Sequence, residues 1–151
     1  MKNEAQYHEA FTIERVYPRP RAAVWAAWST REQKAKWMGS SDLAMDFRQG
    51  GSERSTFREA MGEHVNEGRY FEIDEERRIV LAYSMALNGR VHTVSLATIV
   101  FLDEKSGTRL RYMEQMCIIP PSDGVEGRTH GWGILLDALG AQLTRIVAPA
   151  S

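Results

Sequence analysis

The sequence has one cysteine, no long apolar run and almost no net charge, and each shortage excludes a class of protein. Cys117 alone cannot form an intramolecular disulfide or a zinc site built only from cysteines. Apolar runs such as 99–102 are far shorter than the roughly 20 residues that a membrane-spanning helix needs. The 19 basic and 20 acidic residues give a net charge of -1, so neither a nucleic-acid-binding surface nor a polybasic membrane anchor is expected. The first residues, MKNEAQYHEAF, lack the apolar centre of a secretory signal, which favours a cytoplasmic protein.

What the chain does contain is typical of a soluble globular domain. Hydrophobic residues make up 43% and charged residues 26% of its 151 residues, close to the average for such domains. A chain of this length buries roughly 70% of the surface that its unfolded form exposes, which allows a sizeable core. No repeat, linker or low-complexity stretch is present, so residues 1–151 are predicted to form a single domain with a core over about 11–147.

Hydrophobic patterning predicts a strand, two short helices, six strands and a long helix, in that order. Residues 11–17 alternate as a strand does, and Pro20 suits the first turn of a helix over 22–29. Thr30 is a good N-cap for a second helix, which Gly39 ends. The remaining strands are expected at 43–48, 52–58, 64–74, 78–87, 91–102 and 108–118.

The last segment, about 125–147, has the periodicity of one amphipathic helix. Its apolar residues fall on a single stripe, formed by Trp132, Leu135, Leu136, Leu139, Leu143 and Ile146. A run of strands followed by a helix predicts an α+β fold in which the helix packs on an antiparallel sheet. A curved sheet that grips one long helix can leave a cavity between the two.

Glycines are unusually frequent within this predicted helix. Gly127, Gly131, Gly133 and Gly140 each cost about 1 kcal/mol relative to alanine in a helix. One interpretation is a pliable N-terminal half that opens over a cavity. The alternatives are close packing of the helix on the sheet and a helix that begins later.

An ordered set of segments carries a family resemblance. They are FTIERVY, AAVWAAWSTREQKAKW, DFRQGG, RYFEI, RRIVLAYSM, SLATIVF, GTRLRYMEQ and GWGILLDALGAQL. Together, over about residues 11–146, they resemble the SRPBCC or START-like superfamily, in the branch related to the activator of the heat-shock protein 90 ATPase. The resemblance implies a helix-grip fold of about seven strands, with an apolar cavity under the C-terminal helix. It implies function poorly, because members bind lipids, hormones or polyketides and some act as cyclases or co-chaperones.

Two stretches depart from the pattern of that family. One is IIPPSDGVEG after the last predicted strand, where relatives commonly have a short aromatic-Asp-Gly turn. The other is His92-Thr93, where many relatives carry a small hydroxyl residue. Both are expected near the mouth of a cavity, so no relative's ligand is carried over to this chain.

Arg15 is a charged residue on a strand face that should point inward with Ile13 and Tyr17. A buried guanidinium needs a partner, because desolvating an unpaired charge costs several kcal/mol. Glu114 on the last predicted strand is the expected partner, since helix-grip folds place the first and last strands side by side. The pair could anchor a ligand head group, act as an acid and base, or form a structural salt bridge. Alternatively, Arg15 reaches outward along its aliphatic stem.

The four histidines do not show the spacing of a metal site. The motifs HxH, HxxxH and HExxH are missing from the sequence, and Cys117 has no histidine near it, so we expect no metal and no cofactor. His130 faces away from the apolar stripe of the last helix. His64 and His92 lie near strand starts, where exposure to solvent is usual, although either could act as a general base.

Aromatic and other large side chains are frequent on the strand and helix faces expected to point inward. They either fill the core or form the apolar walls of a pocket with a few polar tips. The candidate ligand-binding residues are Arg15, Trp28, Trp37, Phe47, Phe57, Tyr70, Tyr83, Met85, Tyr112, Glu114, Met116, Trp132 and Leu136.

The leading hypothesis is a protein that binds a small apolar molecule, of lipid or polyketide type, between the last helix and the sheet. No catalytic residue is assigned, and nucleic acid and membrane are not expected partners, while a homodimer is left open. The first alternative is a cyclase or hydrolase that uses cavity tyrosines and Glu114. The second is a module that regulates a chaperone ATPase.

Overall fold

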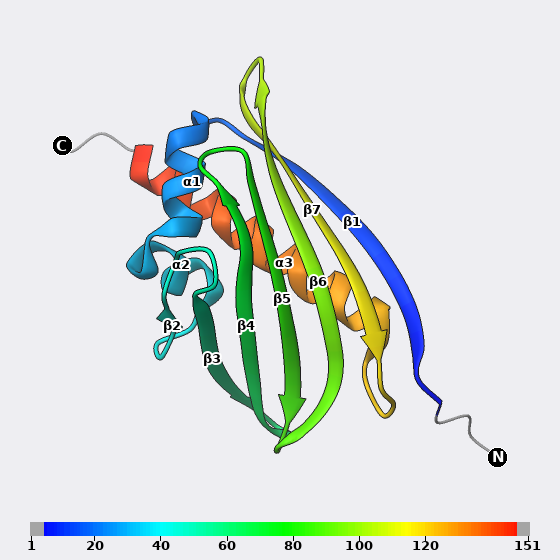
Figure 1. The fold of residues 1–151 in the computed structure, drawn as a ribbon. Coiled ribbons are helices and arrows are strands. Elements are labelled where there is room, and N and C mark those ends of the chain that lie inside the picture. Colours follow the sequence, from blue (N-terminus) through cyan, green and yellow to red (C-terminus); the bar gives the residue numbers. More distant parts are fainter. Residues whose placement is uncertain (1–4, 148–151) are drawn as a thin grey trace.

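The computed structural model describes residues 5–147, which form a curved antiparallel sheet wrapped around one long helix (Figure 1). The elements are β1 (Tyr7–Tyr17), α1 (Arg21–Ser29), α2 (Arg31–Met38), β2 (Ala44–Met45), β3 (Ser52–Glu59), β4 (Gly62–Asp74), β5 (Arg78–Leu87), β6 (Arg90–Glu104), β7 (Gly107–Ile118) and α3 (Gly124–Val147). This is the predicted α+β helix-grip fold. None of the helices within 5–147 is long and apolar enough to cross a membrane.

The strands follow the order β1-β7-β6-β5-β4-β3-β2 across the sheet, and all neighbours are antiparallel. Tyr7 lies opposite Ile118, and Tyr17 lies opposite Thr108. The predicted adjacency of the first and last strands is therefore confirmed. Asn88 and Gly89 form the turn between β5 and β6, with φ of 51° and 86° in the left-handed region that two-residue hairpins favour.

The strand after the two short helices is much shorter than predicted. The sequence pattern indicates a strand over 43–48, but only the two residues of β2 pair with β3. Residues 46–51 instead form a tight turn, in which the Gly51 N–H donates to the Arg48 carbonyl over 2.8 Å. A side chain at Gly51 would lie 2.0 Å from the Asp46 carbonyl oxygen, so this turn requires glycine.

The two short helices lie against the C-terminal part of α3 (Figure 1). The Gln142 side-chain amide on α3 donates to the Gln33 carbonyl on α2 over 2.9 Å. Gly39 ends α2 with φ of 65°, as predicted, but Thr30 makes no side-chain capping hydrogen bond. The N-terminal half of α3 extends past these helices and faces the sheet directly.

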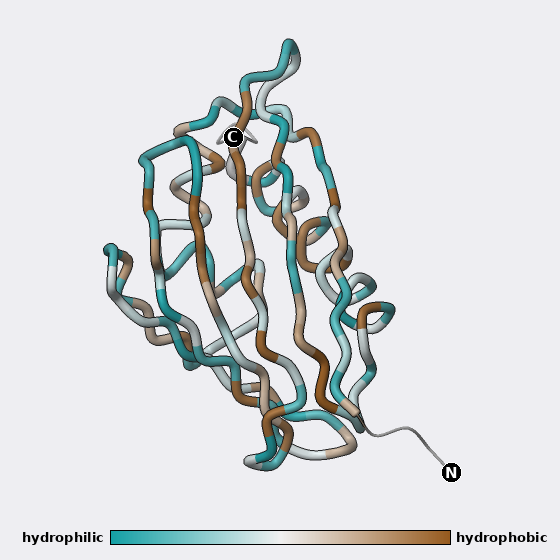
Figure 2. The backbone as a smooth tube through the Cα atoms, turned by 45° about the vertical axis from the view of Figure 1, so that its right-hand side comes forward, coloured by the Kyte–Doolittle hydropathy of each residue, from teal (hydrophilic) through white to brown (hydrophobic). Residues whose placement is uncertain are grey.

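The apolar stripe of α3 lies at the centre of the core. Leu136 and Leu139 are fully buried, and the Tyr17 hydroxyl donates to the Leu136 carbonyl over 2.7 Å. A Cβ on Gly140 would lie 3.1 Å from the Tyr17 ring, so at this position the glycine allows close packing of α3 on β1. Figure 2 shows hydrophobic residues alternating with hydrophilic ones along the strands, which matches a sheet with one face on this core.

Candidate ligand-binding cavity

A cavity of about 1180 Å³ is lined by the N-terminal half of α3, by α1 and α2, and by the inner faces of β3 to β7. Its apolar walls include Trp28, Leu81, Tyr112 and Trp132. The Tyr112 and Trp132 rings stack with their centroids 4.2 Å apart, and the Trp28 ring lies parallel to Trp132 at 6.1 Å. The rings cover one another, so Trp28 and Tyr112 are each only 1% exposed and Trp132 is 9% exposed.

The rim of the cavity is apolar and exposed to solvent. It is lined by Phe57, Met61 and Ile134, which are 42%, 71% and 57% exposed, respectively. Exposed large apolar residues that gather around a concavity often mark a place where something binds. The cavity is thus accessible from outside.

The structure brings together about half of the candidate residues predicted from the sequence. Those that line the cavity are Trp28, Phe57, Tyr83, Met85, Tyr112 and Trp132. Those that lie outside its lining, packed in or against the core, are Trp37, Phe47, Tyr70, Glu114, Met116 and Leu136. Both departures from the family pattern contribute to the lining as well, through His92 and residues 121–123.

The predicted pairing of Arg15 with Glu114 is wrong. Arg15 lies opposite Leu110 in the sheet, whereas Phe11 lies opposite Glu114. The Arg15 Nε donates instead to Asp137 on α3 over 2.8 Å, and a third of the Arg15 side chain remains exposed. Arg15 thus reaches outward along its stem, which is one of the alternatives that the sequence allows.

The partner of Glu114 is Arg128, a residue of α3 that the sequence analysis missed. Arg128 Nη1 lies 2.6 Å from Glu114 Oε2, and these side chains are 5% and 0% exposed. Glu114 also accepts hydrogen bonds from the hydroxyls of Ser95 (2.6 Å), Tyr83 (2.7 Å) and Tyr112 (2.7 Å). The carboxylate therefore accepts four hydrogen bonds in the interior.

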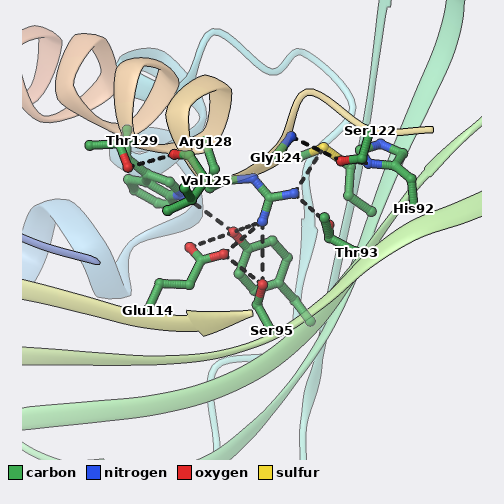
Figure 3. A network of polar contacts seen from close by, with 12 residues as sticks. His92, Thr93, Ser95, Glu114, Ser122, Gly124, Val125, Arg128 and Thr129 are labelled. Atoms are coloured by element: carbon green, nitrogen blue, oxygen red, sulfur yellow. Dashed lines mark hydrogen bonds and ion pairs between the residues drawn. The ribbon is translucent and has the colours of Figure 1, made fainter. Parts of the chain in front are cut away.

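Arg128 connects α3 to three strands across one end of the cavity (Figure 3). Its guanidinium contacts Glu114 on β7, Ser95 and Thr93 on β6, and Tyr83 on β5. Charge-assisted hydrogen bonds of this kind are stronger than neutral ones. They fix the N-terminal half of α3 at a set distance from the sheet.

Electrostatics keeps the two phenols and the guanidinium of this network in fixed protonation states. Burial, reinforced by the Glu114 charge, raises the pKa of the Tyr83 phenol, and burial raises the pKa of Tyr112 well above its usual value. Burial alone would lower the pKa of Arg128, but the neighbouring Tyr83 and Glu114 outweigh it and the pKa is raised. At neutral pH the phenols are protonated donors and Arg128 is a cation.

A second buried ion pair lies elsewhere in the cavity lining. Lys34 Nζ on α2 lies 2.6 Å from Glu53 Oε1 on β3, with side-chain exposures of 3% and 13%. The Tyr70 hydroxyl donates to the same oxygen, and the Lys34 ammonium lies 5.2 Å from the centre of the Trp28 ring. Lys34 is three residues before Trp37 on α2 and shares its face, a spacing that could have indicated burial.

His92 is buried, contrary to the exposure that its place near a strand start suggests. It is 4% exposed and its Nδ1 lies 3.2 Å from the Ser122 hydroxyl. The register between β5 and β6 shifts between Met85 and Ala86, and this bulge turns both His92 and Thr93 inward. Burial, with a smaller contribution from the Arg128 charge, lowers the pKa of His92.

His64 lies beside His92, with the ring centroids 6.1 Å apart. Its Nε2 is 3.0 Å from Glu59, and its ring stacks on Phe57 at 4.5 Å. Within residues 5–147, no group of three or more His, Cys, Asp or Glu side chains could hold a metal ion.

The whole fold matches proteins of known structure. The family described as Activator of Hsp90 ATPase homolog 1-like protein matches residues 18–144. An uncharacterized protein from Rhizobium leguminosarum is 32% identical, with a TM-score of 0.89 over 93% of this chain and 97% of that one. Protein Mll3558 from Rhizobium loti is 34% identical, with a TM-score of 0.86 over 91% and 99%. Protein CV1439 from Chromobacterium violaceum, at 23% identity and a TM-score of 0.75 over 89% and 96%, shares the fold. No curated protein matches the sequence.

Proposed function

Because the chain belongs to the Activator of Hsp90 ATPase homolog 1-like family, within the START-like superfamily, we propose that it binds a small, largely apolar molecule between α3 and the sheet. The observation that carries the proposal is the cavity of about 1180 Å³ with its aromatic walls. Small-molecule sites are concave, mostly apolar and furnished with a few placed polar groups. A molecule in this cavity would lie against the accessible part of Trp132 and cover the exposed apolar rim.

The two buried ion pairs support a cavity that exists before the ligand arrives. Arg128 with Glu114, and Lys34 with Glu53, satisfy their charges within the protein. They hold α3 and α2 to the sheet on either side of the aromatic walls. A preformed site avoids the entropic cost of ordering on binding, which favours affinity.

Binding is better supported than tyrosine-based catalysis. A cyclase or hydrolase that used Tyr83 or Tyr112 as a base would have to remove a proton from a phenol near neutral pH. The raised pKa of each phenol opposes that step. A cytoplasmic location and a homodimer stay predictions.

Filling the cavity from Gly131 tests the proposal. Gly131 lines the cavity, and a Cβ there would meet no atom within 4 Å, so a larger side chain can be added without a clash at its base. The probe is N-phenyl-1-naphthylamine, an uncharged dye whose fluorescence rises in apolar sites. We expect saturable binding to the wild type, at least tenfold weaker binding to Gly131→Phe, and wild-type binding to Gly131→Ala, which controls for the change of helix propensity. Failure of the wild type to bind the dye, or equal binding by Gly131→Phe, would refute the proposal.

A further inference from the structure

Buried polar atoms without a partner are concentrated in residues that line the cavity. Within residues 5–147, five buried side-chain nitrogen or oxygen atoms have no hydrogen-bond partner in the protein, and four of them belong to residues that line the cavity. These four are Trp28 Nε1, His64 Nδ1, Asn66 Oδ1 and His92 Nε2. Proteins satisfy roughly 90% or more of their buried polar groups, so a cluster of exceptions in one place calls for an external partner.

Three of these atoms share one end of the cavity. His64 and Asn66 are two residues apart on β4, so their side chains point to the same face of the sheet. The His92 ring lies 6.1 Å from the His64 ring, centre to centre. This end, formed by His64, Asn66 and His92, is called the polar end below. His92 is only 4% exposed, whereas His64 and Asn66 are half-buried and His64 stacks on Phe57 of the rim, so the polar end extends from the rim into the protein.

Hydrogen bonds on the other side of each group indicate what the polar end offers. The His64 Nε2 lies 3.0 Å from the Glu59 carboxylate, and when the neutral ring donates there, His64 Nδ1 is an acceptor. The Asn66 amide nitrogen donates to the Ser55 hydroxyl over 3.5 Å, which leaves Asn66 Oδ1 as a second acceptor. The Ser122 hydroxyl contacts His92 Nδ1, and when it donates there, His92 Nε2 carries the proton and is a donor.

Charges in the lining argue against a charged ligand group at this end. Each lysine or arginine of the lining is already engaged: Arg128 with Glu114, Lys34 with Glu53, and Arg90 with three backbone carbonyls of the loop after β7. A carboxylate would therefore find no free cation to compensate its desolvation. An ammonium group would lie near the Arg128 charge but also near Glu59 and Asp123, so the test below includes one. An uncharged group that both donates and accepts fits the offered atoms.

We propose that the ligand is an uncharged molecule with an alcohol or phenol hydroxyl, and that this hydroxyl hydrogen-bonds at the polar end formed by His64, Asn66 and His92. The inference rests on the proposed function, because it assigns chemistry to a molecule in the same cavity. Neighbouring atoms cover these three atoms, so the side chains of the polar end turn toward the cavity as the ligand binds. The hydroxyl then donates to His64 Nδ1 or Asn66 Oδ1 and accepts from His92 Nε2. Its apolar remainder lies along the aromatic walls.

A matched set of biphenyls tests the chemistry of the head group. Biphenyl, 4-hydroxybiphenyl, biphenyl-4-carboxylate and 4-(aminomethyl)biphenyl share one apolar body and differ in the group at one end. Each competes at pH 7.5 with N-phenyl-1-naphthylamine bound to the wild type. We expect 4-hydroxybiphenyl to displace the dye at about a tenth of the concentration that the other three compounds need. The reason is that its hydroxyl supplies the hydrogen bonds that the buried polar atoms of the polar end lack.

Variants of the polar end locate the effect. We expect Asn66→Leu and His92→Leu to lower the affinity for 4-hydroxybiphenyl until it is close to the affinity for biphenyl. The affinity of each variant for biphenyl should stay within about threefold of the wild-type value. Leu87→Met, an apolar exchange opposite His64 in the same lining, is the control and should keep the preference. A preference that survives in both polar-end variants would overturn the assignment of these residues.

The wild-type series decides the proposal even where a variant fails to fold. Equal affinities across the set, as expected if water alone satisfies the polar end, would overturn it, and so would tighter binding of the carboxylate or the ammonium compound. In each of those cases the dye still binds and the proposed function stands. A wild type that binds neither the dye nor any biphenyl removes both.

Discussion

Replacing Glu114 with glutamine should destabilise the protein far more than its single-atom change suggests. The carboxylate is fully buried and accepts four hydrogen bonds, one of them from the Arg128 guanidinium. Glutamine keeps one acceptor oxygen and puts an NH₂ group where the other accepted hydrogen bonds. The two hydrogen-bond donors that contacted the replaced oxygen then face the donating NH₂ group. Arg128 remains as a buried cation with no counter-charge.

The structure sets the scale of this effect. Removing one partner of a buried, hydrogen-bonded ion pair costs about 3–5 kcal/mol, because the remaining charge is stranded in the interior. A domain of this size has a total stability of about 5–15 kcal/mol, so Glu114→Gln should remove a large part of it. Removing both charges, in Glu114→Gln with Arg128→Met, should recover about 2 kcal/mol relative to the sum of the single changes.

Urea unfolding at pH 7.5, followed by tryptophan fluorescence, measures these free energies of unfolding. Glu72→Gln serves as the control, because Glu72 pairs with Arg78 at the surface and its loss should change stability little. The reasoning fails if Glu114→Gln costs less than about 1 kcal/mol, the value typical of an exposed pair, or if the two single changes are additive.

Other consequences of the structure are open to direct measurement. Lys34→Met leaves the buried Glu53 carboxylate unpaired and should cost about 3 kcal/mol in urea unfolding; an unchanged midpoint would contradict the buried pair. Burial lowers the pKa of His92 below 6.5 in the folded protein, so the unfolded chain takes up the proton first. Stability should be full above pH 6.5 and fall as the pH drops through that value, and a series of unfolding curves from pH 7.5 to 5.5 should show a smaller fall for His92→Asn. Leu139→Ala should cost about 2–5 kcal/mol and Ile134→Ala less than about 0.5 kcal/mol, because the first residue is fully buried and the second is 57% exposed; similar losses in thermal unfolding would refute the placement of α3.

The fold was predictable because its signals are local and repeated. Alternation along the strands and the 3.6-residue stripe of α3 each recur over many residues, so single exceptions do not alter the result. The stripe held a further signal, since Arg128 lies four residues before Trp132 and shares its face. Extending the stripe by one turn would have placed a charged residue on the buried side of α3.

The candidate site was harder to predict because it depends on depth and on local irregularities. The strand alternation of Arg15 was assigned correctly, but alternation does not tell how far a residue lies from the edge of a sheet, and there a long side chain reaches solvent. His92 turns inward at a bulge between β5 and β6, which no period-two pattern encodes. The Lys34–Glu53 pair joins a helix to a strand, and pairings of that kind are set by tertiary packing.

The position of β1 at the side of β7 has a consequence for how the protein is made. Tyr17 and Leu136, which share a hydrogen bond, are 119 residues apart in the chain. Contacts of such separation slow folding, because a long loop must close before they form. On the ribosome, β1 emerges before β7 and α3 and cannot complete its contacts until both have been synthesised. The middle strands can pair as hairpins during synthesis, whereas the cavity takes shape only when α3 has left the exit tunnel.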